Sequence, residues 1–399
     1  MVIRNPHFER LPSHYLFVEI ARRAERFRRD YPQLPLISLG IGDTVIPILP
    51  NISKAMASAA YRLSTNEGYR GYGSERGSES LRQAIAQEVY QGKIDVNSIS
   101  ISDGAKCDLH RLQSLIGVQS SIGVQDPAYP VYVDGSLLQG TKRILPLPCN
   151  KENNFFPDLE KAPHLDVLYL CSPNNPTGMV APREQLEGLV RYAQDQQTLI
   201  IFDRAYSDFI NDPLIPKSIY EIEGAEEVAI EVGSFSKQAG FTGIRLGWSV
   251  VPAQLHYPNG LPIQPDWFRL LSTTYNGPSY LAEQGGLAAL DPCNKEGIQS
   301  TLALYRENGR LLRSLLQGTG YRVEGGEHAP YLCVEIPGKS SWEAFDQWLY
   351  KAGLLVTPGA PFGPSGEGYI RLSLFFTPDK REELENRLKG LLLDEKREG

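Results

Sequence analysis

The sequence has few cysteines and no paired cysteine motif, and this scarcity excludes two classes of protein. Five cysteines are spread over the 399 residues without a Cys-x-x-Cys pair, namely Cys107, Cys149, Cys171, Cys293 and Cys333. An odd, widely spaced set argues against a disulfide framework and against a zinc knuckle. We therefore expect a reducing, cytoplasmic environment and predict no metal site.

Long apolar runs and an excess of positive charge are also missing. No apolar segment approaches the ~20 residues that span a bilayer, and the first thirty residues lack the apolar core of a signal peptide. Lys and Arg number 40 against 47 Asp and Glu, so the net charge is −7. A dedicated nucleic-acid-binding protein uses a basic excess to displace counterions. We expect small-molecule partners, and neither a membrane nor a nucleic acid.

The apolar residues that are present follow an α/β pattern. Short apolar runs begin at Ile99, Ile122, Val167, Leu199 and Val228, and helical patterns lie between them. This alternation predicts a mostly parallel sheet flanked by helices, with ligands at the carboxyl ends of the strands. After residue 291, a long amphipathic helix and two strand-like segments predict a smaller α+β domain. We expect a large domain at residues 45–292 and a small domain formed by residues 1–44 and 293–399.

The most informative segment, residues 234–248, follows directly from a predicted strand and contains one lysine, Lys237, among hydroxyls and glycines. A lysine can form a Schiff base with an aldehyde cofactor. Ser234, Ser236 and Arg245 could bind a phosphate, with the arginine as a bidentate clamp. This combination suggests pyridoxal 5′-phosphate. An exposed turn lysine is the alternative for Lys237 taken alone.

Three further segments follow predicted strands. Asp203 could keep a pyridine nitrogen protonated, although a helix N-cap is an equally simple role. Tyr206 and Asn175 could each reach the phenolic oxygen of the cofactor ring, although the Asn175 segment is a turn by composition. The Gly-Ala-Lys turn at residues 104–106 joins a strand to a helix, so its N–H groups could bind phosphate, or it could be an ordinary turn.

Taken in order along the chain, these segments resemble the fold type I aminotransferases, and the similarity covers essentially the whole chain. The resemblance implies that Lys237 is the Schiff-base lysine, that Asp203 pairs with the pyridine nitrogen, and that Arg371 binds the substrate α-carboxylate. It assigns the remaining cofactor contacts to Ala105, Lys106, Tyr129 as the stacking aromatic, Asn175, Tyr206, Ser234, Ser236 and Arg245. Tyr72 would reach the phosphate from the neighbouring subunit, which implies a homodimer with shared active sites.

Longer strings at residues 39–44, 71–77, 102–108 and 236–243 are similar to those of one branch, the LL-diaminopimelate aminotransferases. The resemblance implies that three residues of the partner subunit join Lys106 in binding the distal end of the substrate; these are Tyr15, Glu75 and Asn276. A second zwitterionic group needs an acceptor for its ammonium and donors for its carboxylate, and these side chains supply both. Gly42 and Asn175 complete the predicted substrate site.

The implied reaction is a ping-pong transfer of an amino group, with Lys237 as the base. The amino donor would be L-glutamate and the acceptor the opened keto form of tetrahydrodipicolinate, giving LL-diaminopimelate for lysine and peptidoglycan precursors. Two alternatives keep the fold: an aminotransferase for aspartate, aromatic or other amino acids, with Glu75 as a surface carboxylate, or a lyase that uses the same cofactor. A non-catalytic cofactor-sensing regulator would need a DNA-binding domain before Pro35, where the segment is short.

Overall fold

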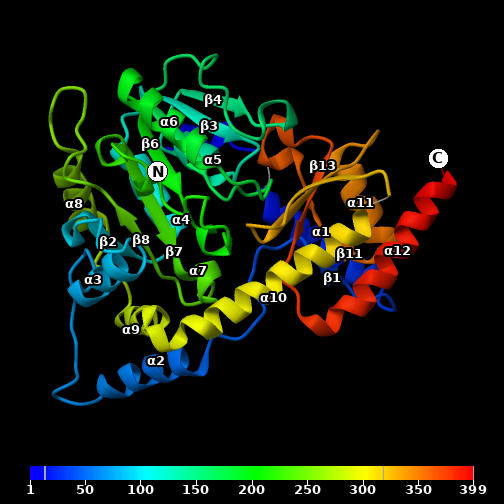
Figure 1. Ribbon diagram of the computed structural model, residues 1–399, viewed down its shortest axis with the longest axis horizontal. Helices are drawn as coiled ribbons and strands as arrows, with labels where there is room; N and C mark the ends of the chain where they lie inside the picture. The colour runs from blue at the N-terminus through cyan, green and yellow to red at the C-terminus, as the bar shows by residue number, and fades with distance from the viewer. Residues whose placement is uncertain (13–14, 318, 399) are drawn as a thin grey trace.

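The computed structural model of the chain describes residues 1–12, 15–317 and 319–398. A seven-stranded sheet forms the centre of its larger part, on the left in Figure 1. The strand order is β2 (Ile99–Ser102), β8 (Gly247–Val250), β7 (Ala229–Ser234), β6 (Leu199–Asp203), β5 (Val167–Cys171), β3 (Ser121–Asp126) and β4 (Arg143–Pro148). Neighbours are parallel except that β8 is antiparallel to both β2 and β7. The predicted mostly parallel sheet is confirmed, whereas β4 and β8 were not expected.

Helices cover both faces of this sheet. Successive side chains of a strand point to opposite faces, so one strand contributes to an apolar cluster on each side. Ile201 lies in a cluster with residues of the helices on one face, and Ile200 and Phe202 lie in a cluster on the other. The first face is covered by α4 (Ala105–Leu115), α5 (Val131–Leu138) and α8 (Ile263–Thr274). The second face is covered by α3 (Glu79–Glu88), α6 (Arg183–Gln196) and α9 (Tyr280–Leu290). A strand buried on both faces reads as a continuous apolar run, which is why these strands could be predicted.

A four-stranded antiparallel sheet forms the centre of the smaller part, on the right in Figure 1. Its order is β12 (Thr357–Pro358), β13 (Tyr369–Ser373), β10 (Tyr331–Glu335) and β9 (Arg322–Gly325). Its apolar cluster also contains residues of α1 (Leu16–Asp30), α11 (Ser341–Ala352) and α12 (Arg381–Glu398). The N-terminal segment joins this part because β1 (Ile37–Ser38) pairs in parallel with β11 (Leu354–Leu355).

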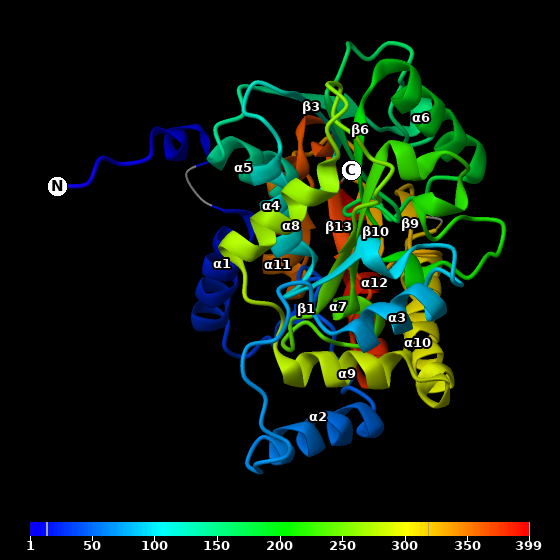
Figure 2. The same cartoon turned by 90° about the vertical axis from the view of Figure 1, so that its left-hand side faces the viewer.

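Helix α10 (Pro292–Leu316) connects the two parts, and helix α2 (Pro50–Arg62) lies on the outside of the larger part (Figure 1). The long helix α10 runs from one part to the other, and its side chains belong to an apolar cluster of each. Helix α2 lies outside α9, at the bottom of Figure 2. Because α10 contributes to both clusters, the domain boundaries at residues 45 and 292 stay a prediction.

The remaining elements are short. Helix α7 (Phe235–Gln238) follows β7, and 3₁₀ helices lie at Pro6–Arg10, Val96–Ser98, Lys151–Asn153, Ser207–Phe209, Ile219–Glu221, Ala225–Glu227, Ala360–Phe362, Pro364–Gly366 and Pro378–Lys380. Within the described ranges, no helix has the length and apolar character that crossing a bilayer requires.

Candidate active site

Lys237 lies in α7, directly after β7, and points toward the N-terminal segment. Its ammonium donates a hydrogen bond to the carbonyl of Gly42. Burial lowers the pKa of Lys237 to about 8; Asp43 opposes this shift, and the positive charges of Arg371 and Arg245 reinforce it. A lysine with this pKa is partly neutral near neutral pH, so it can act as a nucleophile and as a base. Two predicted residues, Lys237 and Gly42, are therefore in contact.

Asp203 is the last residue of β6 and is 5% exposed. Its Oδ2 accepts a hydrogen bond from the Tyr132 hydroxyl at 2.8 Å, and its Oδ1 accepts one from the Ala205 N–H at 2.9 Å. Burial raises the pKa of Asp203, and these two hydrogen bonds oppose the shift. The carboxylate is thus held in one orientation at the edge of the sheet where α/β proteins bind ligands.

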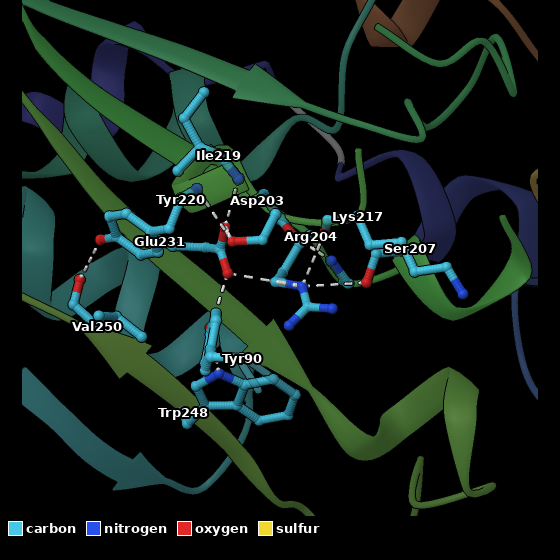
Figure 3. A network of polar contacts seen from close by, with 12 residues as sticks. Tyr90, Asp203, Arg204, Ser207, Lys217, Ile219, Tyr220, Glu231, Trp248 and Val250 are labelled. Atoms are coloured by element: carbon cyan, nitrogen blue, oxygen red, sulfur yellow. Dashed lines mark hydrogen bonds and ion pairs between the residues drawn. The ribbon is translucent and has the colours of Figure 1, made fainter. Parts of the chain in front are cut away.

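A network of buried polar side chains includes Arg204, the residue after Asp203, and is drawn in Figure 3. We use "buried network" for Tyr90, Arg204, Ser218, Glu231 and Trp248. Arg204 Nε lies 3.6 Å from Glu231 Oε1, and their side chains are 4% and 0% exposed. Glu231 also accepts hydrogen bonds from Tyr90 and Ser218, each at 2.7 Å, and Trp248 donates to Tyr90 at 2.9 Å. Because Arg204 follows Asp203 in the chain, this network fixes the end of β6.

Arg371 and Asn175 are in contact and form a second group of site residues. Arg371 is 1% exposed and donates to Asn175 Oδ1 at 2.7 Å, to the Gly40 carbonyl and to Thr357 Oγ1 at 3.2 Å. Its guanidinium lies 4.4 Å from the centre of the Tyr331 ring. The Nε atom of Arg371 is buried and has no hydrogen-bond partner among the described residues. A buried guanidinium with an unused donor suits a carboxylate.

Tyr206 connects to the same group. Its hydroxyl lies 3.5 Å from Asn175 Nδ2 and 3.1 Å from the Tyr331 hydroxyl. Burial raises the pKa of Tyr206 well above its usual value, and the nearby Tyr331 adds to the shift. Tyr206 is therefore a neutral hydroxyl that can donate a hydrogen bond, as predicted for a residue on the phenolic oxygen of a cofactor ring.

The predicted phosphate-binding residues also lie together. Helix α4 begins at Ala105 without a side-chain cap, so its first N–H groups are available to an anion. Gly104 has φ +114°, and a Cβ there would overlap the Arg245 guanidinium. Arg245 donates to Ser236 Oγ at 3.4 Å, and the Ser236 N–H donates to Ser234 Oγ at 3.1 Å. Glycine suits position 104 because L side chains rarely adopt this φ and because a Cβ would push aside the end of the Arg245 side chain.

Tyr129, Lys106 and Tyr15 form a third contact group. The Lys106 ammonium lies 3.4 Å from the Tyr15 hydroxyl and 5.6 Å from the centre of the Tyr129 ring. Burial raises the pKa of Tyr15 to about 12; Tyr129 adds to the shift and Lys106 opposes it. Tyr15 reaches Lys106 within one chain, so a second subunit is not needed for this contact. Its predicted origin in the partner subunit stays a prediction.

The other residues predicted to come from the partner subunit lie apart from these groups. Tyr72 is 91% exposed, and Glu75 accepts a hydrogen bond from Ser272 of α8 rather than contacting Lys106. Asn276 is also exposed and directly precedes Gly277, which packs against Ser74 and Glu75. We call Tyr72, Glu75 and Asn276 the outer patch.

Several residues of the site were missed from the sequence. Tyr132 and Tyr331 bind the predicted residues Asp203 and Tyr206, and Thr357 binds Arg371. Tyr132 lies three positions after the predicted Tyr129, but nothing in its surroundings indicates a partner 71 residues away. Tyr331 begins a predicted strand, where an aromatic residue is ordinary.

A family model described as "Aminotransferase class I and II" matches residues 35–388. The chain belongs to this family. LL-diaminopimelate aminotransferase of Protochlamydia amoebophila is 50% identical over 386 residues, which cover 94% of each chain. The chloroplastic LL-diaminopimelate aminotransferase of Arabidopsis thaliana is 46% identical, covering 94% of this chain and 84% of the relative. The predicted resemblance to this branch is confirmed.

Solved structures place the fold in the same aminotransferase family. The L,L-diaminopimelate aminotransferase of Chlamydomonas reinhardtii superposes with a TM-score of 0.94 at 45% identity and covers 98% of both chains. An aspartate aminotransferase of Thermus thermophilus, at 22% identity, shares the fold with a TM-score of 0.85. Enzymes of this aminotransferase family depend on pyridoxal 5′-phosphate. Arg245 beside Gly104 and the uncapped start of α4 fit the phosphate of that cofactor. The unused donor of Arg371 fits a carboxylate substrate.

Proposed function

We propose that this aminotransferase interconverts LL-diaminopimelate and 2-oxoglutarate with tetrahydrodipicolinate and L-glutamate, as a step in the synthesis of lysine and peptidoglycan precursors. The observation that carries the substrate assignment is the 50% identity over 94% of the chain with an enzyme named for that substrate. The chemistry of the site supports it, because Lys106 and the outer patch offer donors and an acceptor beyond those that a simple amino acid needs.

The proposed cofactor is pyridoxal 5′-phosphate. Arg245, Ser234, Ser236 and the first N–H groups of α4, at Ala105 and Lys106, would hold its phosphate. Asp203 would pair with its ring nitrogen, Tyr206 and Asn175 would hydrogen-bond its phenolic oxygen, and Tyr129 would stack on its ring. When bound, such a cofactor would supply an electron sink for the bond that is broken at the substrate α-carbon.

Arg371 would bind the α-carboxylate of each substrate. Its guanidinium is already oriented by Asn175, Gly40 and Thr357, so little rotational freedom is lost when a carboxylate binds. Arg371 and Lys237 belong to the same site, since the positive charge of Arg371 helps to lower the pKa of Lys237. Orientation by a buried arginine is the reason we assign the reaction to α-amino acids.

Lys237 would move the proton. Its lowered pKa, about 8, leaves a useful fraction of neutral amine near neutral pH, and the neutral amine accepts the α-proton. The Gly42 carbonyl accepts a hydrogen bond from this amine and so holds it in place. Asp203, fixed by Tyr132 and the Ala205 N–H, would hold its carboxyl group toward the ring nitrogen of the cofactor.

We further propose a homodimer in which each outer patch serves the active site of the other subunit. Exposed aromatic residues support a contact surface beside the outer patch: Tyr61 is 76% exposed and Tyr69 is 66% exposed. Both lie in α2 or the loop that follows it, which runs along the outside of the molecule in Figure 1. Large exposed aromatic residues on one segment are typical of interfaces.

The test is a substrate panel with the purified protein. LL-diaminopimelate and 2-oxoglutarate are mixed with the enzyme, and glutamate formation is compared with that from aspartate, phenylalanine, tyrosine and lysine as amino donors. We expect LL-diaminopimelate to give the highest kcat/KM by at least about 100-fold, since unpaired site groups penalise substrates that lack the distal zwitterion. Similar values across the panel would reject the substrate assignment and leave the family assignment intact.

A further inference from the structure

The segment that carries Glu75 is held on both sides of this residue. Before it, Ser74 is in backbone contact with Gly277, whose φ is +84° and at which a Cβ would overlap the Ser74 carbonyl. After it, the Ser78 N–H donates a hydrogen bond to Glu283 Oε1 at 2.6 Å, and Glu283 is 7% exposed. The backbone around Glu75 is therefore fixed to α9 and to the segment after α8.

Arg76, the cationic residue next to Glu75 in the sequence, contacts other groups and forms no ion pair with it. The Arg76 guanidinium lies 3.9 Å from the centre of the Phe268 ring. It also donates hydrogen bonds to the carbonyls of Asn97 and Ile99. The Arg76 guanidinium is near enough for the Glu75 charge to oppose the lowering of its pKa, but no cation is paired directly with the Glu75 carboxylate among the described residues.

Ser272 is the side chain that contacts the Glu75 carboxylate. Its Oγ lies 3.2 Å from Glu75 Oε1 and 2.9 Å from the carbonyl of Phe268, one turn earlier in α8. A hydroxyl has one hydrogen, and a charged acceptor binds it more strongly than a neutral carbonyl. A neutral donor orients a carboxylate without cancelling its charge, which a lysine or arginine in the same place would do.

We infer that Ser272 is a positioning residue that holds Glu75 Oε1, so that the other carboxylate oxygen can accept the distal ammonium of the longer substrate. This inference rests on the proposed function. L-Glutamate has no distal ammonium, so Ser272 affects the binding of LL-diaminopimelate alone. Ser272 thereby becomes a determinant of substrate selectivity, although it touches neither substrate nor cofactor.

Ser272→Ala in the holoenzyme tests this inference. We expect KM for LL-diaminopimelate to rise about 3- to 10-fold, the size of one ordinary hydrogen bond, because Ser272 acts on the substrate only through Glu75. The kcat of this variant should be unchanged. The half-reaction with glutamate, followed by absorbance, should keep both its rate and its substrate affinity. Ser272→Thr, which keeps the hydroxyl, should restore KM.

Thr273→Ala is the matched control, because Thr273 is also exposed on α8 and bonds the carbonyl four residues earlier at 2.8 Å. It should leave KM unchanged. Adding Ser272→Ala to Glu75→Gln should cause no further loss if the serine acts through Glu75. An unchanged KM in Ser272→Ala, equal losses for both substrates, or additive losses in the double variant would overturn the inference. Failure of the wild-type enzyme to use LL-diaminopimelate would instead reject the proposed function, and this inference with it.

Discussion

The buried network behind Asp203 and the outer patch differ in what holds them in place. Every side chain of the buried network is below 10% exposed and is bonded to other members of the same chain. In the outer patch Tyr72 and Asn276 are exposed and Glu75 is half-buried, and only Glu75 has a side-chain hydrogen bond to another described residue, Ser272. One chain therefore fixes the cofactor side of the site by itself, whereas the residues expected to select the substrate face outward.

This difference separates two kinds of functional residue. Cofactor chemistry needs groups held within a fraction of an ångström, which buried contacts provide. Recognition of a distal substrate group can be supplied by a second copy of the chain. Substitutions in the two regions should accordingly affect different measurements.

The largest effect is expected on the cofactor side, from Lys237→Ala. Removing the nucleophile and base should lower kcat by at least about 10³-fold with every amino donor. The measurement is single-turnover loss of the amino group from LL-diaminopimelate and from glutamate. Lys161→Ala, on the exposed surface, serves as the control and should retain full activity. Appreciable turnover by Lys237→Ala would place the base elsewhere.

The second largest effect is expected from Glu231→Gln, which should lower the free energy of unfolding. The substitution removes the carboxylate that is paired with the buried Arg204 charge, which costs about 3–5 kcal/mol. The check is the free energy of unfolding in urea, compared with Glu335→Gln. The Arg322–Glu335 pair is 3.9 Å apart and partly exposed, so its loss should cost less than about 1 kcal/mol. Similar values for the two variants would show that the network does not support β6.

Glu75→Gln in the outer patch should change selectivity and leave stability unaltered. Loss of the charged acceptor should reduce kcat/KM for LL-diaminopimelate by about 10- to 100-fold, while the glutamate half-reaction stays within about 2-fold of wild type. Paired kinetics with the two substrates provide the measurement. An equal loss for both would remove Glu75 from distal recognition.

The smallest effect concerns pH. The neutral amine of Lys237 reacts with an aldehyde, and the amine loses its proton as pH rises through about 8. Uptake of pyridoxal 5′-phosphate by cofactor-free protein should therefore accelerate about tenfold between pH 7 and 9 and level off above that range. A rate that continues to rise to pH 10 would indicate an exposed lysine with an ordinary pKa.

Much of the cofactor side could be predicted because its residues lie in contiguous motifs that follow apolar strands. Asp203 ends one buried strand, and Lys237 and Asn175 lie shortly after the ends of two others, so their meeting at one edge follows from a parallel sheet. Two strands of the seven-stranded sheet were missed for local reasons, and the short strands β1, β9, β11 and β12 of the smaller part were missed as well. β4 contains Pro146 and Pro148 at the edge of the sheet, and β8 lies within the glycine-rich segment interpreted as a phosphate loop.

The supporting contacts could not be predicted, because they join residues far apart in the sequence. Tyr206 and Tyr331 are separated by 125 positions, and their hydroxyls meet only after the two parts of the molecule pack together. Glu231 interrupts an apolar strand, but the sequence does not indicate that Arg204 is its partner. The outer patch could be named only through the family resemblance, and its assignment to a second subunit is still a prediction.

Mixing two variants that are each defective with LL-diaminopimelate tests the shared site most directly. In a mixed dimer of Lys237→Ala and Glu75→Gln chains, a patch that serves the partner would leave one site with both native residues. Random exchange should then restore roughly a quarter of wild-type activity with LL-diaminopimelate, since half of the dimers are mixed and each has one intact site. If Glu75 serves the site of its own chain, every mixed dimer has two defective sites, and activity stays at the level of the separate variants.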